Sequence, residues 1–426
     1  MTIQRSASAS PLLVGAVTEW GDAAAPTPAQ GDRLALTPEV DALAIDEAGG
    51  AADEQRSIGA HGDEDVGSQR GDDVVSTGHQ TWVPLPALPR PSEVPTAMPL
   101  PVPRGPLSTL LRRVFLGEVD AVAFLTAVQT APAPIDVLFD GDVQIALTML
   151  YELHLQGLRG VSDDWEWNTD LLQARALLEV PLADALDGLA GGVDCTPDSI
   201  AADLTALTAD DGTPGLARFV AREAQLWQVQ EILVHRSLYQ LREADPHTLG
   251  IPRLAGAPKG ALVEVQSDEY GGGRPERMHS ALFARTMTAL GVDASYAAHV
   301  DRVPAITLAS LNALSYLALH RSRLGELVGH LCTVEMTSSA PSRLYSTGLR
   351  RLGFGRNATR FYDEHVEADA MHEQIVARDL AGGLARDQPH RAPDILRGAH
   401  ICTALDELVG THITTSWGDG RSSLLS

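Results

Sequence analysis

From about residue 106 onward, apolar residues recur three or four positions apart, and Gly, Pro and Asp separate the runs. Leu110, Leu111, Val114 and Phe115 show this spacing at the start of the region. A repeat of about 3.6 residues is typical of helices with one buried face, whereas strands alternate with a period of two, which almost no segment here shows. The fold class predicted is therefore all-α, a helical bundle. Predicted helices cover residues 172–190, 197–209, 215–243, 257–270, 275–290, 305–336, 341–352, 356–381 and 393–417.

The first 105 residues lack a periodic apolar face and are rich in Ala, Gly, Pro and acidic residues. Between Pro84 and Pro106 a proline recurs every few residues, which favours extended polyproline geometry over a packed helix. We predict a disordered acidic and Pro-rich tail over residues 1–105, either a solvating leader or a docking segment. Residues 106–210 are predicted to form a helical leader region, and residues 211–426 the main helical domain.

Charge and composition exclude several classes of function. The chain has 56 acidic against 32 basic residues and a net charge of -24, which repels nucleic acid and anionic lipid. No apolar run approaches the roughly 18 residues of a membrane span, and the N-terminus is too weakly apolar for a secretory signal. Cys195, Cys332 and Cys402 lie far apart, which supports neither a disulfide framework nor a zinc knuckle. These features predict a cytoplasmic protein.

The sharpest chemical pattern is the segment 361–372, FYDEHVEADAMH. His365, Asp369 and His372 are spaced four and three apart, so in a helix they point within about 60° of one another. Two imidazoles and a carboxylate on one face suit iron or manganese with positions open for oxygen chemistry. The alternative is a solvated polar face, because further acids surround the three residues.

A second pattern is the segment 268–279, DEYGGGRPERMH, where Glu269 is followed by three glycines, Pro275 and His279. Each interior glycine costs a helix roughly 1 kcal/mol, and such interruptions are tolerated more often near functional sites. Either Glu269 or Glu276 could therefore share a metal with His279. The alternative is a plain linker between two helices.

Further acids lie in two other predicted helices. Glu335 follows a strongly apolar run, and buried carboxylates are rare unless they are paired or bind metal, although the pattern equally allows an exposed position. Glu223, Glu231 and Glu243 lie on the predicted helix 215–243, and any of them could supply a further carboxylate. Pairing with Arg236 or Arg242 explains Glu231 and Glu243 without a metal. The leader segment 108–210 shows no chemical pattern, because Glu152 and the histidine two residues later lie on different helix faces.

Four segments together, ADPHTLGIPRL, ALVEVQSDEYGGGRPERMH, GHLCTVEMTSS and FYDEHVEADAMHEQ, resemble the iron-containing redox enzymes of the haem-oxygenase-like di-iron oxidase family. The resemblance spans about residues 215–420. It implies a haem-oxygenase-like bundle of about seven core helices, without haem, and Fe(2+) as cofactor, two ions per chain at full occupancy. The ligands that it implies are Glu269, His279, Glu335, His365, Asp369 and His372.

The remaining ligand, from the first core helix, stays open between two acids. Spacing to His279 favours Glu243 by resemblance. If the helices near residues 231 and 269 are antiparallel around a turn near residue 250, Glu231 instead lies level with Glu269.

The resemblance implies an enzyme that activates dioxygen to oxidise a small molecule by N-oxygenation, desaturation or oxidative C–C cleavage. An external electron donor is implied as well, and such bundles often pair as homodimers. The alternatives are a thiaminase-like enzyme on the same fold and a non-catalytic helical interaction module. A thiaminase-like enzyme needs a cysteine nucleophile, and the only nearby candidate, Cys332, lies in an apolar run where a buried structural thiol is the better interpretation.

Overall fold

The computed structural model describes residues 96–209 and 215–426, apart from the side chains of residues 367–371. Residues 1–95, most of the predicted tail, lie outside the described residues. Residues 96–105 run extended rather than as a disordered tail. Met98 is buried there and forms an isolated parallel bridge with Leu158, so an apolar side chain anchors the end of the Pro-rich stretch.

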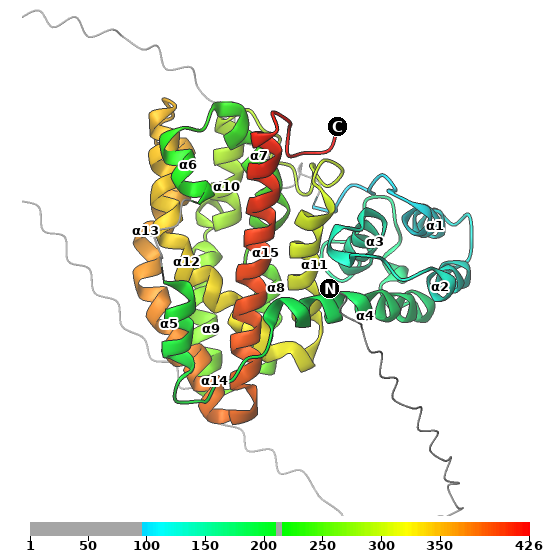
Figure 1. Cartoon of the computed structure of the whole chain (residues 1–426), viewed down its shortest axis with the longest axis horizontal. Helices are drawn as coiled ribbons and strands as arrows, with labels where there is room; N and C mark the ends of the chain where they lie inside the picture. Colours follow the sequence, from blue (N-terminus) through cyan, green and yellow to red (C-terminus); the bar gives the residue numbers. More distant parts are fainter. Residues whose placement is uncertain (1–95, 210–214) are drawn as a thin grey trace, which may run out of the picture. The chain divides into compact units, whose positions relative to one another are not determined.

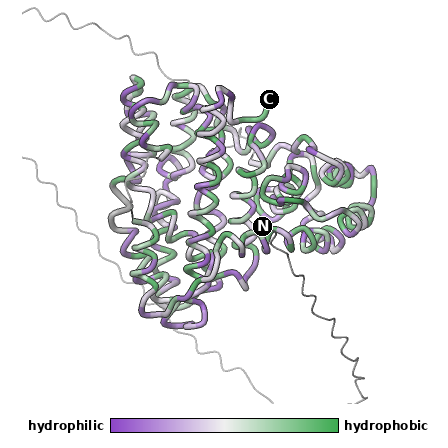
Figure 2. Tube along the Cα trace, in the orientation of Figure 1, coloured by the Kyte–Doolittle hydropathy of each residue, from purple (hydrophilic) through white to green (hydrophobic). Residues whose placement is uncertain are grey.

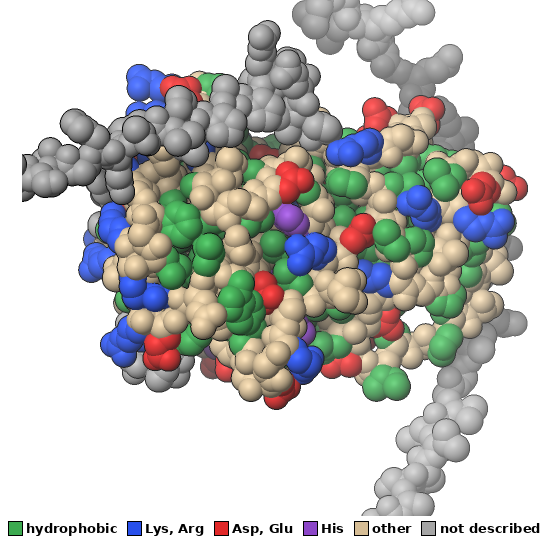
Figure 3. Space-filling model, turned by 90° about the horizontal axis from the view of Figure 1, so that it is seen from above, with side chains coloured by type: hydrophobic (Ala, Val, Ile, Leu, Met, Phe, Trp, Pro, Cys, Tyr) green, Lys and Arg blue, Asp and Glu red, His purple; other side chains and the backbone are tan. Residues whose placement is uncertain are grey.

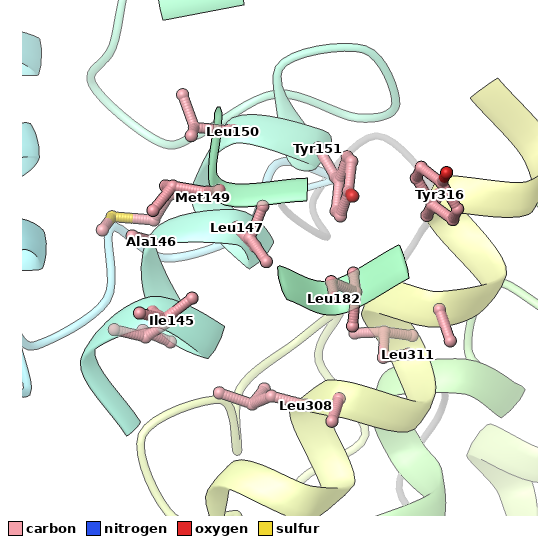
Figure 4. Close-up of a cluster of buried hydrophobic side chains, with 14 of the residues drawn as sticks. Ile145, Ala146, Leu147, Met149, Leu150, Tyr151, Leu182, Leu308, Leu311 and Tyr316 are labelled. Atoms are coloured by element: carbon pink, nitrogen blue, oxygen red, sulfur yellow. The ribbon is translucent and has the colours of Figure 1, made fainter. Parts of the chain in front are cut away.

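Four helices form the N-terminal part: α1 (Pro106–Phe115), α2 (Ala121–Thr130), α3 (Gly141–Glu152) and α4 (Thr169–Ala190). The starts of α3 and α4 follow capping rules, because the side chains of Asp140 and Asn168 accept hydrogen bonds from backbone N–H groups of the first turn. Side chains of α3 such as Ile145 and Leu147 pack with Leu182 of α4 and Leu308 of α11 in one apolar cluster (Figure 4).

The remaining helices form the bundle. They are α5 (Ile200–Thr208), α6 (Leu216–Arg222), α7 (Leu226–Gln240), α8 (Asp245–Thr248), α9 (Gly256–Glu269), α10 (His279–Ala289), α11 (Ala305–Leu319), α12 (Leu324–Arg351), α13 (Arg356–Gln374), α14 (Gly382–Asp387) and α15 (Ala392–Gly418). A π-helix, η8 (Ile375–Ala381), joins α13 to α14. The part of the chain that the structure describes contains no strand, which confirms the all-α prediction.

Helices α7, α10, α12, α13 and α15 run alongside one another (Figure 1), and α12 packs against both α13 and α15. Two glycines permit the close approach of α12 and α15. A Cβ atom at Gly329 would collide with the carbonyl of Ile395, and one at Gly398 would collide with the backbone of Glu326. The bundle therefore depends on glycine where these two helices cross.

Three predicted helix boundaries were wrong, each for a local reason. The predicted helix 215–243 is interrupted between α6 and α7, where the backbone N–H of Gln225 donates to Gln228 and starts a new helix. The predicted helix 305–336 breaks after Leu319, because Arg253 donates hydrogen bonds to the last carbonyls of α11, those of Ala318 and Leu319. Helix α12 then continues through Pro341, where we had predicted a boundary.

The tube in Figure 2 alternates between apolar and polar stretches along the helices, as expected of elements with one buried face. On the face drawn in Figure 3, outside the grey atoms, apolar side chains stand among charged side chains of both signs. Among the described residues, every helix is too short or too polar to cross a lipid bilayer.

Candidate metal centre

Four helices and one turn bring the candidate ligands together inside the bundle. Glu269 is the last residue of α9, and His279 is the first residue of α10. Glu335 lies near the middle of α12, and His365 and His372 lie on α13. The fifth contributor is the turn between α7 and α8, which carries Glu243.

The link between α9 and α10 explains the glycine run of the sequence. Gly271, Gly272 and Gly273 all have φ values between 61° and 76°, the left-handed region that favours glycine. A Cβ atom at Gly271 would lie 2.6 Å from the backbone of Arg277, so this position also requires glycine for space. The tight link returns the chain so that His279 faces Glu269.

A first cluster consists of Glu243, Glu269, His279 and His365, all buried, with one potential ligand atom from each lying within 4.8 Å of the others. His279 Nδ1 is 2.8 Å from Glu269 Oε2 and 4.0 Å from Glu243 Oε2. His365 Nε2 is 3.8 Å from Glu243 Oε1, while its Nδ1 lies 2.8 Å from the carbonyl oxygen of Phe361. Because a carbonyl only accepts, Nδ1 of His365 carries the proton, and the Nε2 lone pair of a neutral ring faces the cluster.

A second cluster consists of Glu269, Glu335 and His372. His372 Nδ1 lies 3.0 Å from Glu335 Oε2, and its Nε2 lies 3.0 Å from Asp268 Oδ2. Glu269 belongs to both clusters, so the two groups of ligands share one carboxylate. The side chain of Asp369 lies outside the described residues, and its role as a ligand stays a prediction.

The electrostatics of the site favour a bound cation. Burial raises the pKa of Glu243, Glu269 and Glu335, because a buried carboxylate loses much of the solvation that stabilises its charge. Burial, together with His365, lowers the pKa of His279 to about 4. The imidazoles of His279, His365 and His372 oppose the rise at the carboxyl groups only in part, so the pKa of each carboxyl stays raised. Buried carboxylates that are only partly compensated are costly, and a divalent cation offsets that cost.

Two further observations test whether these residues fit a metal. His279 Nδ1 is buried and has no hydrogen-bond partner, because Glu269 Oε2, although close, lies at the wrong angle. A metal ion would be a partner for that lone pair. At the second cluster, burial opposes protonation of His372, but Glu335 and Asp268 outweigh it and raise its pKa to about 9, so a cation there would displace a proton. The residues present therefore fit a metal bound by imidazole and carboxylate.

A small cavity adjoins both clusters and opens toward the solvent, and it has enclosed room for only about one water molecule. Two buried side chains on its wall have polar atoms without a partner, Gln266 through Nε2 and His247 through Nδ1. The lining residues are Tyr239, Glu243, Ala244, His247, Gln266, Glu269, Leu331, Val334, Glu335, Ser338 and His365.

Of the two acids considered for the first core helix, the structure places Glu243 in the cluster and Glu231 outside it. The carboxylate of Glu231 accepts hydrogen bonds from Trp417 Nε1, Ser422 Oγ and both the backbone N–H and the hydroxyl of Ser423. The geometric argument for Glu231 assumed one helix over both acids, whereas α7 ends at Gln240 and Glu243 lies in the turn that follows it.

The other sequence candidates lie elsewhere. Glu223 and Glu276 are exposed and outside both clusters. Cys332 is fully buried and donates to the carbonyl of Val376, and burial raises the pKa of its thiol well above the ordinary value. A thiol held in this way stays protonated, as expected of a structural cysteine rather than a nucleophile.

Sequence reasoning missed three features near the site. Asp268, the neighbour of Glu269, contacts His372, and its only sequence signal is that adjacency. His330 is buried, and its Nδ1 lies 3.1 Å from His247 Nε2, a contact that the sequence pattern does not indicate. Glu152 of the leader segment is also buried and forms an ion pair described below.

Comparison with known proteins finds a similarity to iron-containing redox enzymes. A family model described as "iron-containing redox enzyme" matches residues 230–407, a range that includes all seven predicted ligands. A nitrosourea synthase of Streptomyces achromogenes subsp. streptozoticus is 24% identical over 188 residues, which is 44% of this chain and 39% of that protein. The chain thus spans about two fifths of the length of this relative. The predicted resemblance to iron-containing redox enzymes is confirmed.

A solved structure, a CADD-like protein of unknown function from Nostoc punctiforme, is also similar. It is 16% identical, with a TM-score of 0.42, over 52% of this chain and 97% of that chain.

Proposed function

We propose that the chain is a non-haem di-iron oxidoreductase that uses dioxygen to oxidise a small molecule. The observation that carries the proposal is the position of Glu269, which belongs to both ligand clusters. A carboxylate shared in this way suits two metal ions held side by side, and helical bundles build such sites from facing helices. The family match to iron-containing redox enzymes supports iron as the metal.

In this proposal Glu243, Glu269, His279 and His365 hold one iron. Glu269, Glu335 and His372 hold the other, with Asp369 as a further ligand. Imidazole and carboxylate together suit Fe(2+) with positions open for dioxygen. Iron bound there supplies the redox chemistry with dioxygen that side chains alone do not perform.

The surrounding residues orient the ligands. The carbonyl of Phe361 fixes the ring of His365 through Nδ1. Asp268 does the same for His372, because it accepts from Nε2 when Nδ1 faces the metal. The side chain of Asp268 is 56% exposed, so it links the buried imidazole to the solvent.

The cavity marks the proposed substrate site, which must widen to admit a molecule larger than water. Leu331 and Val334 form an apolar wall that excludes water, while Gln266 and His247 offer polar atoms to a bound molecule. Among N-oxygenation, desaturation and oxidative C–C cleavage, the similarity to a nitrosourea synthase favours oxidation at nitrogen. The reaction draws electrons from an external donor, and a homodimer is the proposed assembly.

Anaerobic loading with ferrous iron tests the proposal. We expect about two irons per chain, followed by oxygen uptake on exposure to air. Glu269→Gln removes the shared ligand and should lose both irons, whereas Glu276→Gln, an exposed acid in the same segment, should keep them. Iron content well below one per chain in the unaltered protein would sink the di-iron proposal.

A further inference from the structure

The turn that carries Glu243 has an unusual backbone. Helix α7 ends at Gln240, and Ala244 has a φ of 75°. Among the described residues only Ala244 and Ala297 are non-glycine residues with positive φ. Such a conformation costs free energy and persists only where the surroundings enforce it.

A buried ion pair holds this turn from the side of the N-terminal helices. Arg242 Nη1 lies 3.1 Å from Glu152 Oε2, and the two residues are only 3% and 1% exposed. Arg242 also donates through Nη2 to Ser315 Oγ on α11, at 3.1 Å. Glu152 is the last residue of α3, so the pair connects α3 directly to the residue before Glu243.

The second strained alanine belongs to the same network. The hydroxyl of Tyr296 donates to Glu152 Oε1 at 2.7 Å, and Ala297 follows Tyr296 in the chain. Glu152 therefore connects the two segments in which the described structure contains backbone strain.

The other side of the turn is fixed to the shared ligand. Tyr270, which follows Glu269, donates its hydroxyl to Asp245 at 2.8 Å. The turn is thus held between α3 on one side and the end of α9 on the other, and Glu243 lies between the two attachments.

Stability alone is a poor explanation for the Glu152–Arg242 pair. Apolar residues of similar volume often stabilise a core as well as a buried ion pair does, whereas such pairs are useful in fixing one geometry. We propose that Glu152 and Arg242 are positioning residues that set the carboxylate of Glu243 for metal binding. The inference rests on the proposed metal centre and makes α3 part of its support.

Cobalt(II) titration in a His372→Ala background tests this role, because only the cluster with Glu243 then keeps all its described ligands. Glu152→Gln should weaken cobalt binding on the order of tenfold, as loss of supporting contacts does at metal sites. Glu179→Gln is the matched control. It removes another buried acid, whose partners Arg175, His320 and Tyr151 lie outside the turn, and should leave cobalt affinity unchanged.

Further variants and outcomes test the positioning role. Glu152→Asp should recover part of the affinity, because it restores the charge. If Glu152→Gln does not fold, Tyr296→Phe serves instead and should weaken cobalt binding relative to the His372→Ala parent. Its control is Tyr316→Phe, which removes a hydroxyl that accepts from Arg323 and should leave cobalt affinity unchanged. Equal affinities for the test and control variants overturn the positioning role alone, whereas a His372→Ala parent and an unaltered chain that both bind no cobalt overturn the metal centre and this role with it.

Discussion

Glu335 and His372 meet 3.0 Å apart in the core, one from the middle of α12 and the other from near the end of α13. Both are at least nine-tenths buried, and Asp268 approaches the other nitrogen of the imidazole. This contact joins Glu335 to the segment 361–372 that carries His372, although 37 positions separate the two residues in the chain.

Removal of His372 should empty one of the two metal sites. We expect His372→Ala to lower the iron content after anaerobic loading from about two to about one per chain and to abolish oxygen uptake. The cluster with Glu243 keeps its four ligands in this variant. His390→Ala, an exposed histidine outside both clusters, is the control and should keep both irons. Full iron binding by His372→Ala would remove this residue from the ligand set.

Glu243 and Glu231 should respond in opposite ways to the same substitution. Glu243→Gln should weaken metal binding but leave the metal-free protein as stable or more stable, because it removes a buried, poorly compensated carboxylate. Glu231→Gln should keep both metals but lower the free energy of unfolding by about 1–2 kcal/mol, because the charged acceptor of four hydrogen bonds is lost. Metal titration and urea unfolding measure the two effects. Metal loss in Glu231→Gln would revive the geometric argument for that acid.

Hydrophobic periodicity predicted the helices well where one face of a segment is buried along its whole length, as in α9 and α15. It failed where a distant group ends a helix. The break after Leu319 depends on Arg253, a residue 66 positions away, and the local sequence pattern does not indicate it. Pro341 caused the opposite error. Proline usually ends helices, so a boundary was predicted there, but packing keeps α12 continuous through this residue.

Sequence reasoning likewise found some residues of the site and missed others. Ligands on regular helices, such as His365 and His372, follow from spacing. Glu243 remained contested because it lies in an irregular turn, where helical geometry does not apply. Glu152 gave no signal at all, since its partner Arg242 is 90 positions away and an isolated acid next to apolar residues resembles a surface residue.

Acid should destabilise the fold through His235. Burial, reinforced by His412, lowers the pKa of this imidazole to about 3, and its ring nitrogens contact Thr307 and Ser423 hydroxyls. His235 therefore becomes protonated near pH 6.5 in the unfolded chain but only near pH 3 in the folded chain. The stability from neutral His235 is present above pH 6.5 and is lost as the pH falls through that window, by about 2 kcal/mol between pH 7 and pH 5.

Urea unfolding of the metal-free chain at pH 7 and pH 5 measures this loss. His235→Gln is expected to be less stable than the unaltered chain at pH 7 but to lose about 2 kcal/mol less on acidification. The same pH dependence in both proteins would contradict a neutral, buried His235.

The crossing of α12 and α15 should be intolerant of a single methyl group. In Gly398→Ala the new Cβ atom meets the backbone of Glu326, which cannot rotate away as a side chain does, so the helices must separate. We expect a loss of about 3 kcal/mol or more in the free energy of unfolding. Gly410 lies on the same helix with open space around its Cβ position, and Gly410→Ala should stabilise the protein by about 0.5–1 kcal/mol through helix propensity alone. Because α12 carries Glu335, separation of the helices should also weaken metal binding in Gly398→Ala and not in Gly410→Ala. Equal stability of the two variants would show that the helices do not approach each other this closely.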